Sequence, residues 1–211
     1  NTYSNNSNEN RKQSTVKVNA ISQTGIITEN GMSGISDNTN ISSIENEKKT
    51  GIINTYSDKR TSTVYGKVIN SYNNPIKDLV VLGRVPVQGN KKIDTNEELG
   101  SNFNLSMKSK VSIVGLEKAN ILIYYSEKVD ATRDIEEVSN GWTTTPKNLA
   151  DVKSYMIVIS NYDILQGEEL EFKYDVEIPE NLDYGKASYE MYKVYYNNVT
   201  EVGTLTETKE S

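Results

Sequence analysis

The residue types that most enzymes use for nucleophilic and acid–base chemistry are sparse in this chain. Its 211 residues include no cysteine and no histidine. This excludes disulfides, thiolate zinc sites, cysteine nucleophiles and mechanisms with an imidazole base. Carboxylates occur in adjacent pairs at Glu136–Glu137 and Glu168–Glu169, but glycoside hydrolysis needs two carboxyls about 5 to 9 Å apart across a cleft. Adjacent residues on a strand point to opposite faces, so we predict solvated surface charges, no enzyme and no cofactor.

Acidic residues also gather between residues 130 and 137. Hard cations such as Ca²⁺ prefer clustered oxygen ligands, and Asp130 and Asp134 are the candidate ligands, with Glu136 and Glu137 nearby. The segment lacks the ligand spacing of an EF-hand loop. An exposed acidic loop is therefore the simpler interpretation, and a calcium site is the alternative.

Aromatic side chains are the candidate binding groups. Trp142, the only tryptophan, lies among threonines after a glycine. Exposed, it could stack on a sugar ring, whereas packing is favoured because a large indole in a small-residue loop commonly anchors that loop. Tyrosine pairs at 124–125 and 195–196 place one ring on each sheet face, and Tyr125 and Tyr196 are the candidate ligand-binding rings. Cross-strand aromatic pairs also stabilise sheets without any ligand.

The elements that must position these residues are strands. Charged residues occupy every second position from Glu169 to Glu177, and five apolar residues alternate with them: Leu170, Phe172, Tyr174, Val176 and Ile178. A period of two gives a strand with one buried and one charged face. No window of twelve or more residues has a convincing amphipathic helix. The sequence therefore predicts an all-β fold, an immunoglobulin-like antiparallel β-sandwich.

Other strands are expected wherever β-prone residues lie between turn signals. The stronger candidates span 51–56, 62–70, 76–86, 101–105, 111–115, 119–126, 155–160, 169–178 and 188–196, and the weaker ones 14–20 and 25–28. Residues 29–48 are predicted to form a long polar loop, including Asp37–Asn40 as a still weaker cation site, and 127–151 a second irregular segment.

The chain is expected to divide near residue 50. Residues 1–50 would form a polar, partly extended segment with short strands that could end a preceding module, and 51–211 a β-sandwich repeat domain. The chain begins at Asn1 without a methionine or a signal-peptide pattern, so we expect a fragment of a longer protein.

Charge and hydropathy restrict the partners. The formal net charge is -6 and no long basic run is present, which argues against nucleic acid and anionic membranes, since both need a positive surface. No apolar stretch approaches the ~20 residues of a membrane-spanning helix, so we expect no membrane insertion by this fragment.

Six short passages follow one another along residues 61–205, and their order is more informative than any one of them. These are Val64–Val68, Leu79–Pro86, Ile121–Ser126, Gly141–Pro146, Leu165–Glu168 and Tyr195–Asn198. The order resembles DUF11-type and immunoglobulin-like repeat domains, which are stacked in the stalks of large wall-anchored surface proteins of Gram-positive bacteria. The resemblance implies extracellular display at the cell wall, neighbouring repeat domains as partners and a spacer or adhesion role. It supplies no catalytic residues.

Surface sandwiches of this class often contain an intramolecular Lys–Asn isopeptide bond, so the resemblance also suggests one here. Lys67 on an early strand and Asn197 or Asn198 on the last have a suitable order. A buried acid must assist, because the attacking amine has to be neutral and desolvated. Glu171 or Asp175 would supply it, yet the alternation places both on the charged face.

Three functions are compatible with these features. The leading hypothesis is a non-catalytic stalk or spacer unit of a bacterial cell-surface protein, because ladder hydrogen bonds resist shear and charged faces resist aggregation. The first alternative is a binding module for a host matrix protein or glycan, through a sheet edge or the loops around Trp142. The second is an accessory domain of a secreted glycosidase.

Overall fold

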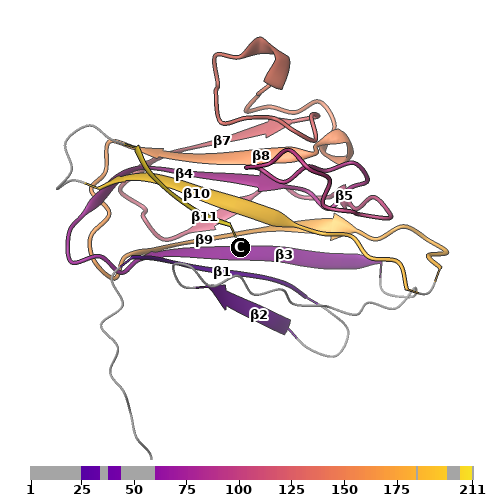
Figure 1. Cartoon of the computed structure of the whole chain (residues 1–211), viewed down its shortest axis with the longest axis horizontal. Helices are drawn as coiled ribbons and strands as arrows, with labels where there is room; N and C mark the ends of the chain where they lie inside the picture. Colours follow the sequence, from indigo (N-terminus) through magenta and orange to yellow (C-terminus); the bar gives the residue numbers. More distant parts are fainter. Residues whose placement is uncertain (1–24, 34–37, 44–59, 184, 199–204, 211) are drawn as a thin grey trace, which may run out of the picture.

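A computed structural model describes residues 25–33, 38–43, 60–183, 185–198 and 205–210 of the chain. Within these residues eleven strands form two antiparallel sheets that pack face to face (Figure 1). The all-β antiparallel sandwich expected from the sequence is therefore confirmed. No helix among the described residues is long and apolar enough to cross a membrane.

The six strands of sheet A are β1 (Ile26–Ser33), β2 (Asn38–Ser43), β3 (Thr61–Asn70), β5 (Ser106–Met107), β6 (Ser112–Val114) and β9 (Glu169–Glu177). The five strands of sheet B are β4 (Ile76–Arg84), β7 (Asn120–Ser126), β8 (Ser154–Ser160), β10 (Met191–Asn198) and β11 (Leu205–Glu210). Two 3₁₀ turns, η1 (Val138–Asn140) and η2 (Leu149–Asp151), lie in the connection from β7 to β8.

The order of sheet A is β2-β1-β3-β9-β5, with β6 also paired to β9, and that of sheet B is β11-β10-β4-β8-β7. The alternation of β9 is confirmed, because its four apolar side chains, and Ile178 directly after it, are all buried in the core between the sheets. The long strand β3 pairs with β9 over nine residue pairs and has the same in–out burial pattern.

Two glycines make room for the aromatic centre of the core. Gly66 lies opposite Phe172 in sheet A, and Gly83 lies opposite Tyr155 in sheet B. A Cβ atom at either glycine would collide with the facing ring. The Tyr155 and Phe172 rings meet across the sandwich with centroids 6.0 Å apart. Glycine inside a strand usually weakens it, and here the neighbouring ring fills the space.

The described path of the chain starts at one end of the sandwich and finishes partway toward the other. Ile26 of β1 pairs with Asn70, and Asn198 of β10 pairs with Ile76, so both lie beside the β3–β4 turn. From that end β11 runs back along β10, from the pair Leu205–Asn197 to the pair Glu210–Lys193. The first described strand therefore begins at one end, and the last described strand runs toward the other.

Two sequence predictions were wrong. Residues 101–105 form no strand, because their backbone bonds go to other loops: Asn102 N–H donates to Ala187 O, and Leu105 N–H to Pro86 O, both at 2.8 Å. The predicted loop 29–48 contains the rest of β1 and all of β2. Ladder hydrogen bonds come from the backbone, so a polar segment can pair at a sheet edge without an apolar pattern.

Strand β1 lies on the N-terminal side of the predicted boundary at residue 50. It pairs with β3 over seven residue pairs, and its Ile26 and Thr28 are fully buried. Residues 26–33 thus belong to sheet A, while the division of the chain into 1–50 and 51–211 stays a prediction. The predicted strands 14–20 and 51–56, and Asp37, lie outside the described residues.

Candidate functional site

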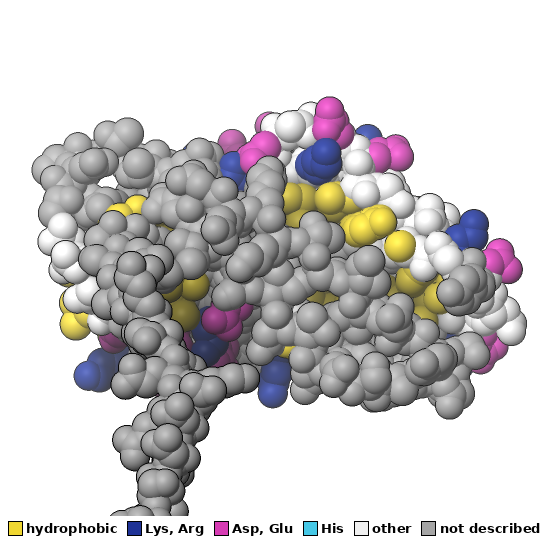
Figure 2. Space-filling model, turned by 60° about the horizontal axis from the view of Figure 1, so that its bottom comes forward, with side chains coloured by type: hydrophobic (Ala, Val, Ile, Leu, Met, Phe, Trp, Pro, Cys, Tyr) yellow, Lys and Arg dark blue, Asp and Glu magenta, His cyan; other side chains and the backbone are white. Residues whose placement is uncertain are grey.

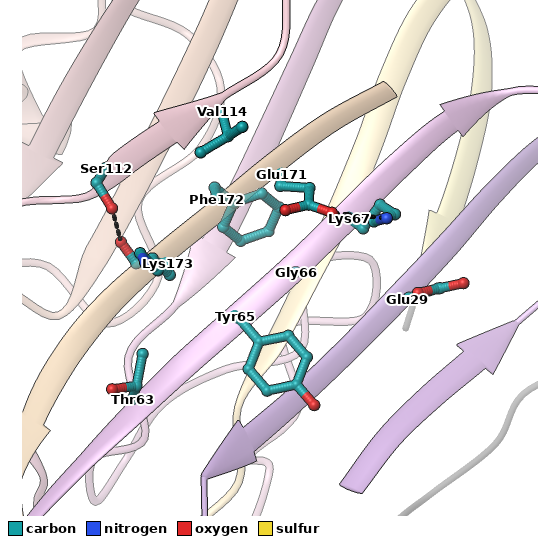
Figure 3. Close-up of a pocket in the computed structure, with 10 residues that line it drawn as sticks. All are labelled: Glu29, Thr63, Tyr65, Gly66, Lys67, Ser112, Val114, Glu171, Phe172 and Lys173. Carbon is teal, nitrogen blue, oxygen red and sulfur yellow. Dashed lines mark hydrogen bonds and ion pairs between the residues drawn. The ribbon is translucent and has the colours of Figure 1, made fainter. Parts of the chain in front are cut away.

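The outward face of sheet A has a hollow of about 350 Å³ near its centre (Figure 3). Alternation along β3 and β9 turns Tyr65, Lys67 and Lys173 toward this hollow, and Gly66 lies between them. β6 contributes Val114 at its rim. The hollow therefore lies over the backbone around Gly66, between outward side chains of β3, β6 and β9.

The charges around the hollow are mixed. Lys67 Nζ lies 2.6 Å from Glu171 Oε1 and 3.3 Å from Glu169 Oε1. The hydrogen bond to Glu171 raises the pKa of Lys67 above its usual value. A lysine that acts as a nucleophile or base must lose its proton, so this environment opposes such chemistry. Among the described residues, neither Lys173 nor Glu29 has an ion-pair partner.

The isopeptide candidates lie in different sheets. Lys67 belongs to β3 of sheet A, whereas Asn197 belongs to β10 of sheet B and donates from Nδ2 to Asp78 Oδ2 at 2.9 Å. The side chain of Asn198 lies outside the described side chains. Glu171 does meet Lys67, but on the outward face, and Asp175 accepts a 2.6 Å bond from Thr63 Oγ1. The structure thus does not bring Lys67 and Asn197 together.

The outward face of sheet B differs, because loops cover it. Leu82, Met156 and Tyr195 are buried there, with Trp142 and four other side chains packed against them. We call these residues the second cluster. The Arg133 guanidinium lies over the Tyr195 ring, 4.5 Å from its centroid. Buried Lys193 pairs with Asp94, which fastens the β4–β5 loop to the same face.

Trp142 anchors the β7–β8 connection to this cluster. Its indole is part-buried, and Nε1–H donates to Thr132 O at 2.9 Å. The indole packs against the second cluster, as the favoured interpretation of this residue expects. No described geometry assigns it a ligand.

Asn140 organises the same loop and was missed by the sequence analysis. Its buried amide donates to Thr132 Oγ1 and Asp134 O at 2.9 and 2.7 Å, and its Oδ1 accepts from Thr132 N–H at 2.9 Å. Ser126 Oγ donates to the Asn140 carbonyl. Gly141 follows in the left-handed region at φ 63°. The sequence predicts only an irregular segment over residues 127–151, which gives no hint of these bonds.

The candidate calcium ligands are engaged elsewhere. Asp134 Oδ1 accepts from Glu136 N–H at 3.0 Å, and the charge of Asp130 acts on buried Arg84. Burial lowers the pKa of Arg84 to about 10, although Asp130 opposes the shift. In the described part of the chain no three acidic side chains lie close enough together to hold a metal ion. The calcium alternative therefore has no geometric support there.

Tyr125 and Tyr196 are core residues, each only 2% exposed. The Tyr125 hydroxyl accepts from Val111 N–H at 3.0 Å, and the Tyr196 hydroxyl lies 2.9 Å from that of Tyr72. The outward members of the pairs are Tyr124 and Tyr195, both in the second cluster. The expected aromatic binding patch at Tyr125 and Tyr196 is thus not on the surface.

The paired glutamates hold turns. Glu168 accepts 2.7 Å bonds from Tyr162 Oη and Leu165 N–H, which closes the β8–β9 turn. Glu137 caps η1 by accepting from Ser139 N–H and Oγ. The hydrogen bond from Ser139 lowers the pKa of Glu137. These contacts give the adjacent carboxylates local structural roles.

One buried carboxyl was not foreseen. Glu190, just before β10, is part-exposed as a residue, but its Oε1 is buried and has no hydrogen-bond partner among the described residues. Asn30 Nδ2 reaches Oε2 at 3.5 Å. The Tyr155 and Tyr174 hydroxyls are also buried, and neither has a geometric hydrogen-bond partner among the described residues. Burial, and to a smaller extent the charge of Glu190, raises the pKa of both tyrosines. Burial raises the pKa of Glu190 to about 8, against the opposing contacts with Asn30 and Tyr155.

Comparison with known proteins gives little further guidance. No protein-family model matches the chain, and no curated protein matches it. Among solved structures, it is similar to a collagen-binding domain from a Staphylococcus aureus adhesin, with 15% sequence identity and a TM-score of 0.34. The match covers 72% of this chain and 86% of that one. At this level the similarity carries no argument, so the function has to be inferred from the chain's own residues.

Proposed function

We propose that this chain is a non-catalytic structural and adhesion module of a bacterial cell-surface protein, where it acts as a stalk or spacer unit. The resemblance of residues 61–205 to wall-anchored repeat domains motivates the extracellular, Gram-positive location and the neighbouring repeats as partners. The alternative roles, a binding domain for a host matrix protein or glycan and an accessory domain of a glycosidase, have no assigned site.

The path of the chain is the observation that carries the proposal. β1 begins beside the β3–β4 turn, and β11 runs from that end toward the opposite one (Figure 1). A unit that receives tension at one end and passes it on at the other suits a stalk. Units joined in this way would extend end to end.

The strand ladders suit such a load. Tension applied at Gly25 and Glu210 acts along the strands, so β1 is pulled against β3 over seven residue pairs. Because these pairs must shear together, their hydrogen bonds resist jointly. The rings of Tyr155, Phe172 and Tyr192 also pack across the two sheets.

Mixed charges on the described surface suit an exposed module. Figure 2 shows Lys and Arg side chains close to Asp and Glu side chains, with hydrophobic side chains in separate patches. Interspersed charges of both signs favour solubility and resist aggregation.

Single-molecule force spectroscopy tests the proposal. The chain has no cysteine, so two introduced thiols define each pulling direction. End-to-end pulling uses one thiol introduced before residue 25 and one after residue 210. The control pulls Asn120→Cys against Ser160→Cys, two cross-strand partners at one end of the β7·β8 pair, which opens that pair one bond at a time. We expect a several-fold higher unfolding force end to end; equal or lower force contradicts the proposal.

A further inference from the structure

β7 is one of the two edge strands of sheet B, and Tyr125 shows which of its backbone groups face the free edge. Tyr125 N–H donates to Thr143 O at 2.8 Å, and Tyr125 O accepts from Thr143 N–H at 3.0 Å. In an antiparallel strand the N–H and C=O of one residue point to the same side, and this side alternates along the chain. The N–H and C=O groups of Ile123 and Ile121 therefore face the same edge as those of Tyr125.

This edge is open beyond Tyr125. Among the described residues, none hydrogen-bonds to the outward backbone groups of Ile121 or Ile123. The covering segment turns away after its single bridge, because Thr145 N–H bonds to the Thr143 side chain at 3.1 Å instead of continuing along β7. The outward N–H and C=O groups of these two residues therefore have no partner among the described residues.

Four common protections of a sheet edge are missing in β7 itself. Edge strands are commonly blunted by proline, charge, a bulge or very short length. Residues 119–126 contain no proline and no charged residue, and β7 pairs with β8 over seven residues without a register shift. Leu122, between the two open positions, is 43% exposed. In sheet A, by contrast, β5 and β6 have only two and three residues.

We propose that the free edge of β7 binds an extended peptide segment of a protein partner, which adds as a short strand beside Ile121 and Ile123. Backbone hydrogen bonds would give affinity, and alternate apolar side chains of the peptide would pack beside Leu122 and Tyr124. The β7–β8 loop rises beyond this edge (Figure 1). It obstructs the sheet of a second folded copy, whereas a single extended chain needs only the open backbone.

The short edge implies weak binding by one unit. Two residues offer at most four outward backbone groups, so affinity would depend on several copies acting together, as neighbouring repeats on one stalk would. The surface is independent of the stalk proposal, since unfolding force does not depend on whether the β7 edge is occupied.

The test uses unconstrained seven-residue peptides displayed on phage and selected against the whole chain. Synthetic versions of enriched peptides are then titrated while amide exchange is followed by NMR. We expect the Ile121 and Ile123 amides to gain at least tenfold protection. Alternate residues of a bound peptide point their N–H groups toward β7. N-methylation of those residues should abolish binding, whereas N-methylation of the residues between them should preserve it.

Two variants check the site from the protein side. Ile123→Pro removes an outward N–H that the β7·β8 ladder does not use, and Leu122→Lys adds a charge beside the edge without changing the backbone. Each should weaken peptide binding at least tenfold, while Val114→Lys, an exposed residue on sheet A, should leave it unchanged. Enrichment of no peptide, protection elsewhere, binding that survives both folded variants, or self-association through β7 would each overturn the proposal.

Discussion

The outward faces of the two sheets have opposite environments. On sheet A, alternation along β9 leaves an open, ion-paired surface, with Lys67 between Glu169 and Glu171. On sheet B, the corresponding face is a second apolar cluster, because the β4–β5 and β7–β8 loops lie over Leu82 and Met156. The first face contributes solubility and the second contributes stability.

The comparison explains why the two sheets have different sequence patterns. β9 alternates, since only one of its faces is buried. β8 is an almost continuous apolar run, and Tyr155, Met156 and Ile157 are all fully buried. Continuous apolar strands are usual where both faces of a sheet are covered. Here the β4–β5 and β7–β8 loops, and not helices, provide the second cover.

The largest effect is expected from truncating matched outward positions on the two sheets. Met156→Ala should cost about 2–5 kcal/mol of unfolding free energy, because it leaves a cavity in the second cluster. Glu171→Ala on the open face of sheet A should change it by less than about 0.5 kcal/mol. Urea unfolding followed by circular dichroism measures both. Equal costs would remove the distinction between the faces.

The pH dependence of stability should separate buried from open carboxyls. Burial raises the folded pKa of Glu190 from 4.5 to about 8, so its contribution is fully present below pH ~4.5 and is lost as pH rises through 8. The slope should be at most about 1.4 kcal/mol per pH unit in that window. Lys108 lowers the pKa of exposed Glu177, whose contribution is instead lost as pH falls. Glu190→Gln should flatten the slope between pH 5 and 8, measured by urea unfolding; an unchanged slope would exclude Glu190 as its source.

Loss of the Asn140 amide should loosen the loop over sheet B. Asn140→Ala removes three hydrogen bonds within the loop and should cost about 1–3 kcal/mol. Trp142 is the only tryptophan, so its fluorescence reports on the loop directly, and we expect a red shift before global unfolding. Thr145→Ala, nearby in the same loop, serves as the control. An unshifted spectrum in Asn140→Ala would show that other contacts hold the indole.

The smallest effect is expected on the open face of sheet A. Lys67→Ala removes ion pairs with Glu169 and Glu171 whose carboxylates are about half exposed, so the loss should be within ~1 kcal/mol and should shrink as salt is added. Thermal unfolding at low and high ionic strength measures it. A larger, salt-independent loss would mean that Lys67 stabilises the fold through packing.

Local patterns predicted the elements that depend on side-chain burial. The period of two identified β9, and β-prone runs located β3, β4, β7, β8 and β10 to within a few residues. Elements that depend on backbone pairing were missed. β2 has no apolar pattern, and residues 101–105 look strand-like although their backbone bonds go to distant loops.

The surroundings of the candidate site residues depend on contacts between segments that are distant in the sequence. The Tyr124–Tyr125 pair indicates one ring on each face, but the sequence cannot say which face is covered. Asn140 and Glu190 depend on partners from other segments: a serine at 126, and tyrosines on two strands. No spacing within the sequence predicts those contacts.

Small-angle scattering from two copies of the chain joined in tandem tests the stalk account most directly. Because β1, the first described strand, begins beside the β3–β4 turn and β11 runs toward the other end, we predict that the second copy extends the particle lengthwise and roughly doubles its maximum dimension. A tandem hardly longer than one copy, with the two units folded side by side, would contradict the account.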